Sequence, residues 1–280
     1  MRITREWALV LIGVPIAFLV AFFFVPFAIV VVDSFRVQDG TWTLANYRKA
    51  IGDPFYWEVL LITFRLSLYV TIAAFLIGYP LAYFIVRMVE SRLLRSLLYI
   101  VVVTPLFTSN IVRAFGWIVL LGRRGLVNDA MIATGISERP IPLLYGESSI
   151  VIGLTYIMVP FMVLTIASVL QNIDRSLEEA ARDLGAGAWS TFWRVTFPLS
   201  MPGVIAGALI VFTLSVSAYV TPSILSGGRQ NTTSILIFQQ YASIMDFHFG
   251  GALAVVLLIT TILLVSVSLI GANRRQQAAS

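Results

Sequence analysis

Cysteine is absent from this chain of 280 residues, and histidine and lysine occur once each, as His248 and Lys49. The absence of cysteine excludes disulfides, thiolate metal sites and cysteine nucleophiles. An ATP-binding P-loop needs Gly-x4-Gly-Lys-Ser/Thr, but Lys49 lies in ANYRKA, which is not a glycine-rich loop. One histidine cannot build a histidine-rich metal site, and the sequence shows no Ser/His/Asp or paired-carboxylate pattern. We therefore expect no catalytic residue, no metal site and no cofactor in this chain.

Charged residues are scarce as well. They make up 12% of the chain, against about 25% in an ordinary soluble domain, whereas 59% of the residues are hydrophobic. Several apolar runs exceed the roughly 20 residues that a helix needs to cross a bilayer. The net charge of +5 comes mainly from arginine, which orients membrane helices, so we expect no nucleic-acid partner. The composition predicts an all-α, polytopic membrane protein embedded in a lipid bilayer.

The apolar runs predict one transmembrane domain, residues 1–280, with six spans. The first run is too long for a signal peptide and has no small-x-small cleavage site after it. Arginine is denser in the N-terminus, the 87–95 turn, the 171–197 stretch and the tail than in the loops between them. By the positive-inside rule, both termini and the 171–197 stretch should be cytoplasmic. The predicted spans are about 8–32, 58–86, 97–121, 148–170, 202–225 and 251–271.

The polar stretch 171–197 lies between the fourth and fifth spans and contains a short helix pattern. Ser176 and Glu179 have the spacing of a capping box, and Glu178 can pair with Arg182 one turn later. Gly185 is placed to end the helix. An apolar stripe at helical spacing has nothing in its own loop to bury it, which favours a partner surface over a solvated loop. The stripe consists of Leu177, Ala181, Leu184 and Ala188.

An aromatic segment, residues 189–197, follows this helix. Trp189, Phe192, Trp193 and Thr196 share one helical face, which is typical of a segment at the membrane interface. We expect the proline at position 198 to stop this segment, and the one at 202 to lie in the first turn of the fifth span.

The two segments together resemble the EAA loop of the permeases of binding-protein-dependent ABC importers, whose pattern is EAA-x3-G-x9-I-x-L-P. Here the loop reads Glu179-Ala180-Ala181, three residues, Gly185, nine residues, then Val195-x-Phe197-Pro198, with Val195 and Phe197 in place of Ile and Leu. The resemblance implies a type I ABC importer permease fold and a coupling helix seated in a cytoplasmic ATPase subunit. The implied docking residues are Glu178, Glu179, Ala180, Ala181, Asp183, Leu184 and Gly185, framed by Val195, Phe197 and Pro198.

The same resemblance implies a complex in the bacterial inner membrane. Its other members would be a dimer of ATPase subunits, which binds the ATP and Mg²⁺, and a periplasmic or lipid-anchored substrate-binding protein. A second, homologous permease would complete the pathway. The chain itself would transport and not catalyse.

Two further stretches, 105–117 and 217–228, the second followed by residues 237–241, resemble the PotB-type permeases of spermidine/putrescine importers, which pair with a PotC-type permease. This resemblance implies a polyamine as the solute. Relatives with similar stretches carry other small solutes, so an amino acid derivative, an opine-like compound or another organic cation stays open.

Two arginines lie within predicted spans, Arg65 and Arg113, and an intramembrane charge is a functional candidate by default. Two arginines would repel a polycation, so Arg65 is expected to bind helix carbonyls or a carboxylate of the second permease. Arg113, near the outer end of the third span, could extend to the membrane surface or line the pathway. The residues that could line the pathway are Asn110, Arg113, Trp117, Tyr219 and Thr221; interhelical hydrogen bonds and interfacial anchoring are the alternative.

Two other classes remain to be weighed. An ion-coupled carrier usually places acids or broken helices at the membrane midplane, and the predicted spans carry acids only near their ends. A membrane-embedded enzyme needs a catalytic constellation that the sequence does not show.

Overall fold

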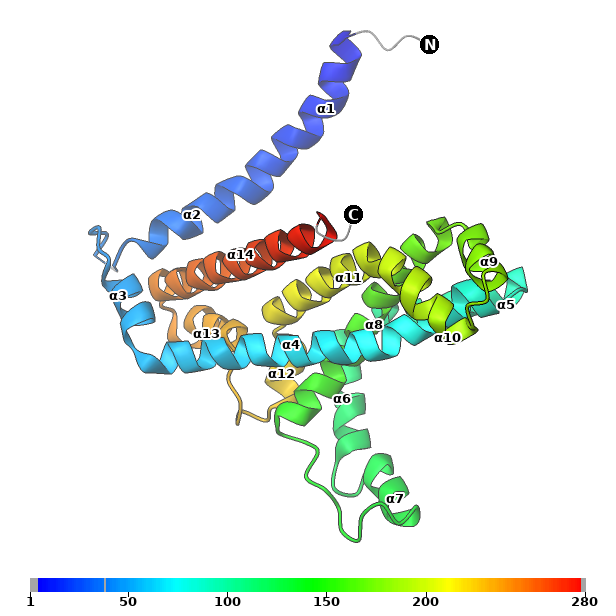
Figure 1. Ribbon diagram of the computed structural model, residues 1–280. Coiled ribbons are helices and arrows are strands. Elements are labelled where there is room, and N and C mark those ends of the chain that lie inside the picture. The colour runs from blue at the N-terminus through cyan, green and yellow to red at the C-terminus, as the bar shows by residue number, and fades with distance from the viewer. Residues whose placement is uncertain (1–4, 38, 278–280) are drawn as a thin grey trace. The chain divides into compact units, whose positions relative to one another are not determined.

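The computed structural model describes residues 5–37 and 39–277, and the side chains of 11–37 and 39–270 (Figure 1). In this part of the chain the regular structure is helical, and the only β pairing is an isolated bridge between Arg36 and Trp42. The all-α prediction is confirmed. The chain forms two units, residues 1–58 with 236–262, and residues 59–235 with 263–280.

The first unit contains the N-terminal helical run and the loop that follows it. Ser34, at the end of this run, shares a 2.6 Å hydrogen bond with Tyr47 Oη, and Asn46 Nδ2 donates to the backbone oxygens of Ser34 and Arg36. These bonds fold the loop back onto the end of the run. The helices are α1 (Arg5–Leu19), η1 (Val20–Phe24), α2 (Val25–Ser34), α3 (Ala45–Gly52), η5 (Gln240–Ile244) and the first half of α14 (Phe247–Gln277).

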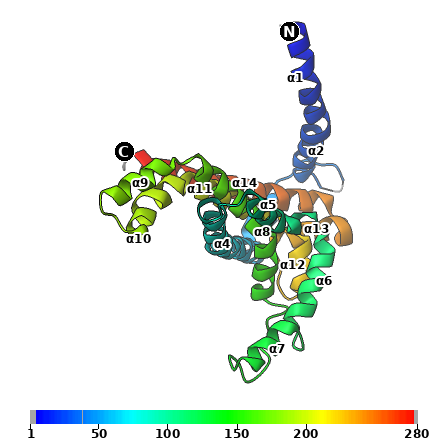
Figure 2. The ribbon, with the colours of Figure 1, turned by 90° about the vertical axis from the view of Figure 1, so that its right-hand side faces the viewer.

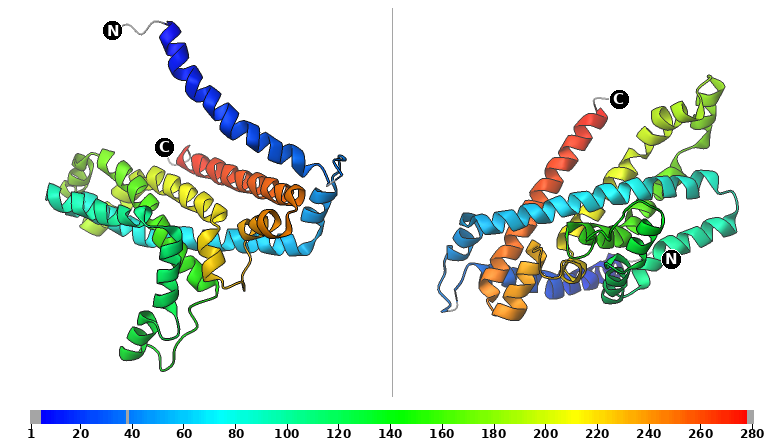
Figure 3. Two further views of the ribbon diagram at one scale, coloured as in Figure 1. Left: turned by 180° about the vertical axis from the view of Figure 1, so that it is seen from behind. Right: turned by 90° about the horizontal axis from the view of Figure 1, so that it is seen from below.

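The second unit carries the residues of functional interest. Helix α8 (Glu147–Asn172) lies among the other helices of the unit (Figure 2). On one side of α8 the chain extends into α6 (Asn110–Leu121) and α7 (Leu126–Ala133), and at the far end lie α9 (Arg175–Asp183) and α10 (Ala188–Thr191) (Figure 3). The remaining helices are α4 (Pro54–Tyr83) from residue 59 on, η2 (Phe84–Met88), α5 (Arg92–Val103), η3 (Thr104–Phe107), η4 (Phe192–Thr196), α11 (Phe197–Ser217), α12 (Val220–Leu225), the start of α13 (Thr233–Gln239) up to residue 235, and the second half of α14.

Helix α8 is the centre of the core because small residues let its neighbours approach. A Cβ added at Gly203 or Gly207 of α11 would meet Val169 at 2.9 Å or Thr165 Oγ1 at 2.5 Å. On α4, a Cβ at Gly78 would come within 2.9 Å of Met162. Close backbone approach through small residues is how helices associate without a hydrophobic driving force in lipid. The Gly203-x3-Gly207 pair therefore serves packing within this chain.

Five helices of the described residues are long and apolar enough to cross a membrane, or six if one bent pair counts as a span. The bent pair corrects the third predicted span, 97–121, because its two limbs meet at 99° with the break at residues 108–109. The fifth predicted span, 202–225, is corrected at both ends. One helical run covers residues 188–217, and a second break at Ala218 and Tyr219 precedes α12.

Candidate functional site

Helix α9 begins differently from the predicted capping box. Asp174, not Ser176, is the N-cap, and its Oδ1 accepts a 2.9 Å hydrogen bond from the Ser176 backbone N–H. This backbone bond, followed by one with the Ser176 side chain, holds the pKa of the Asp174 carboxyl below its usual value. An aspartate is as good a cap as serine, and here the chain enters the helix with Asp174 extended at φ −63° and ψ 129°.

The other end of α9 confirms the prediction for Gly185. Its φ is +87°, its N–H donates to the Arg182 carbonyl, and the next N–H, of Ala186, donates to the Ala181 carbonyl. This pair of bonds is a Schellman motif, which needs a left-handed residue at this position. The chain therefore reverses direction immediately after the helix and leads into α10.

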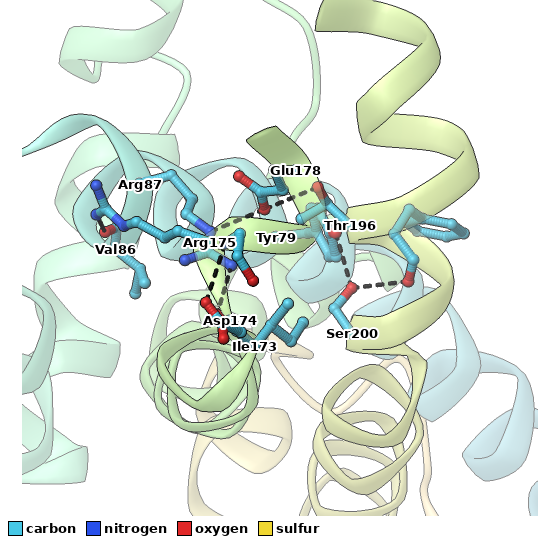
Figure 4. A network of polar contacts seen from close by, with 11 residues as sticks. Tyr79, Val86, Arg87, Ile173, Asp174, Arg175, Glu178, Thr196 and Ser200 are labelled. Atoms are coloured by element: carbon cyan, nitrogen blue, oxygen red, sulfur yellow. Dashed lines mark hydrogen bonds and ion pairs between the residues drawn. The ribbon is translucent and has the colours of Figure 1, made fainter. Parts of the chain in front are cut away.

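Glu178 points inward from α9 and is buried, so its predicted pairing with Arg182 is wrong. Its Oε1 lies 3.1 Å from Arg87 Nε, with the two side chains 11% and 6% exposed, and accepts a 2.9 Å hydrogen bond from Thr196 Oγ1 (Figure 4). Arg87 belongs to η2, the extension of α4, and Thr196 to η4, which leads into α11. One carboxylate thus joins three elements.

Further bonds surround this ion pair. Arg87 Nη2 donates to the Ile173 carbonyl and Arg175 Nη2 to the Val86 carbonyl, each at 3.2 Å, so the two arginines tie η2 and the start of α9 to each other in both directions. Ser200 Oγ donates to the Phe197 carbonyl and lies 2.8 Å from Tyr79 Oη (Figure 4). Since the Ser200 proton is used, Tyr79 donates to Ser200.

The opposite face of α9 is exposed and carries two acids, with the exposed Arg182 beside them. Glu179 and Asp183 are one turn apart and make no ion pair within the described part of the chain. Ala180 is exposed beside them, and Ala181 is half-buried. Leu184 is 89% exposed and Leu177 49%, so the predicted apolar stripe is open. Like charges one helical turn apart repel, which makes this face complementary to a basic surface.

The aromatic segment packs against α4. Phe192 lies edge-on to Tyr79 and Tyr83, with centroids 5.8 and 5.4 Å apart, and Phe197 packs 5.5 Å from Tyr79. Trp189 and Trp193 stay 75% and 47% exposed. Thus half of the predicted interfacial face, Phe192 and the buried Thr196, belongs to the core.

The loop-framing residues have separate roles. Val195 is half-buried, Phe197 begins α11, and Pro198 is exposed in its first turn. Pro198 does not stop the segment as predicted, because a proline needs no N–H partner there. Pro202 lies inside α11, one turn later than expected.

A cavity of about 400 Å³ lies where the two broken spans meet the middle of α8. Asn110 and Arg113 line it from the start of α6, and Tyr219 and Thr221 line it from the start of α12. Broken helices at membrane depth are tolerated where their freed backbone groups line a cavity. The remaining lining residues are Leu106, Leu154, Ile157, Met158, Phe161, Leu214, Ser217, Ala218 and Val220.

The cavity brings together four of the five residues named for the pathway. The fifth, Trp117, packs edge-on against Tyr156 at 5.7 Å and lines a separate apolar pocket of about 470 Å³. Arg113 lies beside the middle of α8. The sequence had predicted a position near the outer end of its span. Arg65 pairs with Glu147, a carboxylate of this same chain.

A family model, the inner membrane component of binding-protein-dependent transport systems, matches residues 74–276. This chain belongs to that family. It is a multi-pass inner membrane protein and a transport component, not a catalytic subunit.

Relatives agree with the family assignment, and solved structures share the fold. The spermidine/putrescine transport system permease protein PotB of Salmonella typhimurium strain SL1344 is 33% identical over 265 residues, 92% of this chain and 91% of that protein. The fold is similar to that of a bacterial ABC transporter involved in alginate import, with a TM-score of 0.77, 17% identity and 97% of each chain covered. A second alginate transporter structure, in complex with its ligand-bound periplasmic protein, gives 0.73 at 17% identity, covering 94% and 93% of the two chains.

Sequence reasoning missed Arg87 and Thr196. Arg87 appeared only as part of a basic turn, and Thr196 only as a member of the predicted interfacial face, with no partner assigned to its hydroxyl. The threonine on an otherwise aromatic face was the available signal, because a hydroxyl that becomes buried needs a hydrogen-bond partner.

Proposed function

We propose that the exposed face of α9 is the coupling surface through which a separate ATPase drives this permease. The strongest support is that one acid of α9 is buried while two others are exposed. Glu178 is buried against Arg87, whereas Glu179 and Asp183 stay exposed without ion pairs in the described residues. An isolated loop helix gains nothing from two unpaired like charges and an 89% exposed leucine. A basic, partly apolar cleft of an ATPase would pair with both.

The ties of α9 indicate how movement would spread into the membrane. α9 is joined to α8 by two residues, but its buried carboxylate also holds η2 and η4. A shift of α9 on closure of the ATPase dimer would therefore move α4 and α11 with it. These helices border α8, and the spans of α6 and α11 break at the cavity. Alternating access would follow if this movement changed the side of the membrane to which the cavity opens.

The proposed solute is a polyamine such as spermidine or putrescine. The support is the 33% identity, over nearly the whole chain, to permeases of spermidine/putrescine systems. Another small solute of the same importer class, such as an amino acid derivative, an opine-like compound or another organic cation, is the alternative. The broken helices also fit an ion-coupled carrier, but the cavity lining includes no acid that could bind the coupling ion.

The proposed assembly has four kinds of subunit. This chain pairs with a second, PotC-type permease on two copies of the ATPase, which bind ATP and Mg²⁺, and a periplasmic or lipid-anchored binding protein delivers the solute. Both termini and α9 lie on the cytoplasmic side, as the arginine distribution favours.

The test uses the complete complex in proteoliposomes. Glu179→Arg and Leu184→Asp should each reduce copurification of the ATPase and ATP-dependent uptake of putrescine. Glu138→Arg, a charge reversal at an exposed acid far along the chain from α9, is the matched control and should change neither. Unchanged ATPase retention in both α9 variants would overturn the coupling surface. Uptake that persists without ATP and collapses with the ion gradient would instead favour the carrier.

A further inference from the structure

Arg113 is the one charged side chain among the residues that line the membrane cavity. It lies in the first turn of α6, directly after the break in its span, and faces the middle of α8. The lining contains no aspartate or glutamate. A charge on a membrane span is costly unless it is paired.

Some N–H donors of the Arg113 guanidinium have no hydrogen-bond acceptor in the described residues. Nη2 donates to Asn110 Oδ1, but Nε and Nη1 are buried and have no hydrogen-bond partner in the described residues. A guanidinium carries five N–H donors and cannot give up its proton in a protein. Three of these N–H groups belong to Nε and Nη1. The amide of Asn110 fixes one corner of the group without neutralising its charge.

Arg65 shows the contrast within the same unit. It too lies on a membrane helix, but this chain supplies its carboxylate, Glu147. Arg113 has no such partner in the described residues, although the adjoining cavity of about 400 Å³ leaves room for one. A carboxylate matches the planar fork of a guanidinium better than a single carbonyl does, because two parallel bonds form at once.

We propose that Arg113 is a binding site for a carboxylate that this chain does not supply. The source is either the second permease, facing the cavity from the other side of the pathway, or the transported solute. The site itself follows from the donors of Arg113, and only the choice of source rests on the proposed function. A polyamine has no carboxylate, so polyamine import requires the second permease as the source. Its carboxylate would then be shared between Arg113 and a passing ammonium group.

The experiment compares two solutes that differ by one carboxylate, putrescine and ornithine, in proteoliposomes that contain the whole complex. The variants are Arg113→Gln, Arg113→Lys and the control Arg65→Gln. If the solute supplies the carboxylate, Arg113→Gln should raise the KM for ornithine about 10- to 150-fold, the range for losing a hydrogen bond to a charged group, and spare putrescine. Arg113→Lys should restore part of the loss, since it keeps the charge but not the fork.

If the second permease supplies it, Arg113→Gln should lower the melting temperature of the purified permease pair and putrescine uptake together. Arg113→Glu should then be rescued by changing one acid of the partner's spans to arginine. This rescue can be read even where a single variant fails to accumulate. The melting temperature also keeps the test valid if the wild-type complex imports neither solute, a result that would overturn only the proposed solute. Arg113→Gln behaving as wild type in the melting temperature and in uptake of both solutes would overturn the carboxylate site.

Discussion

The buried pair of Glu178 and Arg87 allows a quantitative test of how α9 is held. Glu178→Gln keeps the size of the side chain and an oxygen for Thr196 Oγ1, but leaves the Arg87 charge without its counter-ion. With the two side chains 11% and 6% exposed, solvent screens the pair little. Removing one partner of a buried ion pair costs about 3–5 kcal/mol. That corresponds to a roughly 100- to several-thousand-fold rise in the opening equilibrium of α9.

Hydrogen exchange in nanodiscs measures this opening directly at the α9 amides. Glu179→Gln, the adjacent exposed carboxylate, is the control, and its effect should stay within about 0.5 kcal/mol. The double variant Arg87→Met/Glu178→Leu replaces the pair with apolar side chains of similar size, and such replacements are often neutral or stabilising. We expect exchange in the double variant to return close to that of the wild type.

The same variants should affect transport coupling without affecting binding of the ATPase. Glu178→Gln should retain the ATPase, because the exposed face is unchanged, yet import less solute per ATP hydrolysed. The double variant should recover most of this coupling. Equal exchange rates in the Glu178 and Glu179 variants, or a double variant as unstable as the sum of its single changes, would refute the role of the ion pair.

Three further predictions concern backbone and packing. Gly207→Val should lower stability by about 1–3 kcal/mol in thermal unfolding, because even a Cβ would lie 2.5 Å from Thr165 Oγ1, while Gly116→Ala, with open space around it, should not. Gly185→Ala should cost about 1–2 kcal/mol from its φ of +87°, seen as faster exchange at residues 181–186. The lowered pKa of Asp174 means that its cap stabilises α9 fully above the unfolded value of about 3.9 and loses this as pH falls through the folded value. Asp174→Asn should remove this acid dependence of α9 exchange; an unchanged profile would contradict the cap.

The helix α9 and its glycine terminus could be predicted from the sequence, but the contacts of α9 with other helices could not. The spacing from Glu179 to Gly185 predicted a short helix with an exposed acid and a glycine terminus, because helix ends depend on nearby residues. The choice between Asp174 and Ser176 as cap depends on how the chain leaves α8. The pairing of Glu178 with Arg87 joins positions 91 residues apart, and no local pattern encodes such a contact.

The breaks in the membrane spans were hidden for a different reason. The few polar residues at the breaks, such as Ser109 and Ser217, stand between apolar segments, so the sequence remains hydrophobic enough for a span where the helix does not continue. Pro105 was visible, but a proline is tolerated in a membrane helix and does not locate a break. The cavity, and the position of Arg113 beside α8, depend on these breaks, so they became apparent only with the structure.

The reciprocal hydrogen bonds of Arg87 and Arg175 hold α9 in place, so its position does not depend on the covalent link that follows it. Helix α9 is held from its N-terminal side by η2, and η4 is held through Thr196, whereas residues 184–187 between them carry exposed or half-buried side chains. A permease cut after Gly187 and produced as two fragments should therefore reassemble with α9 in place. The same site should accept an inserted reporter domain, which would place a label beside the proposed coupling surface.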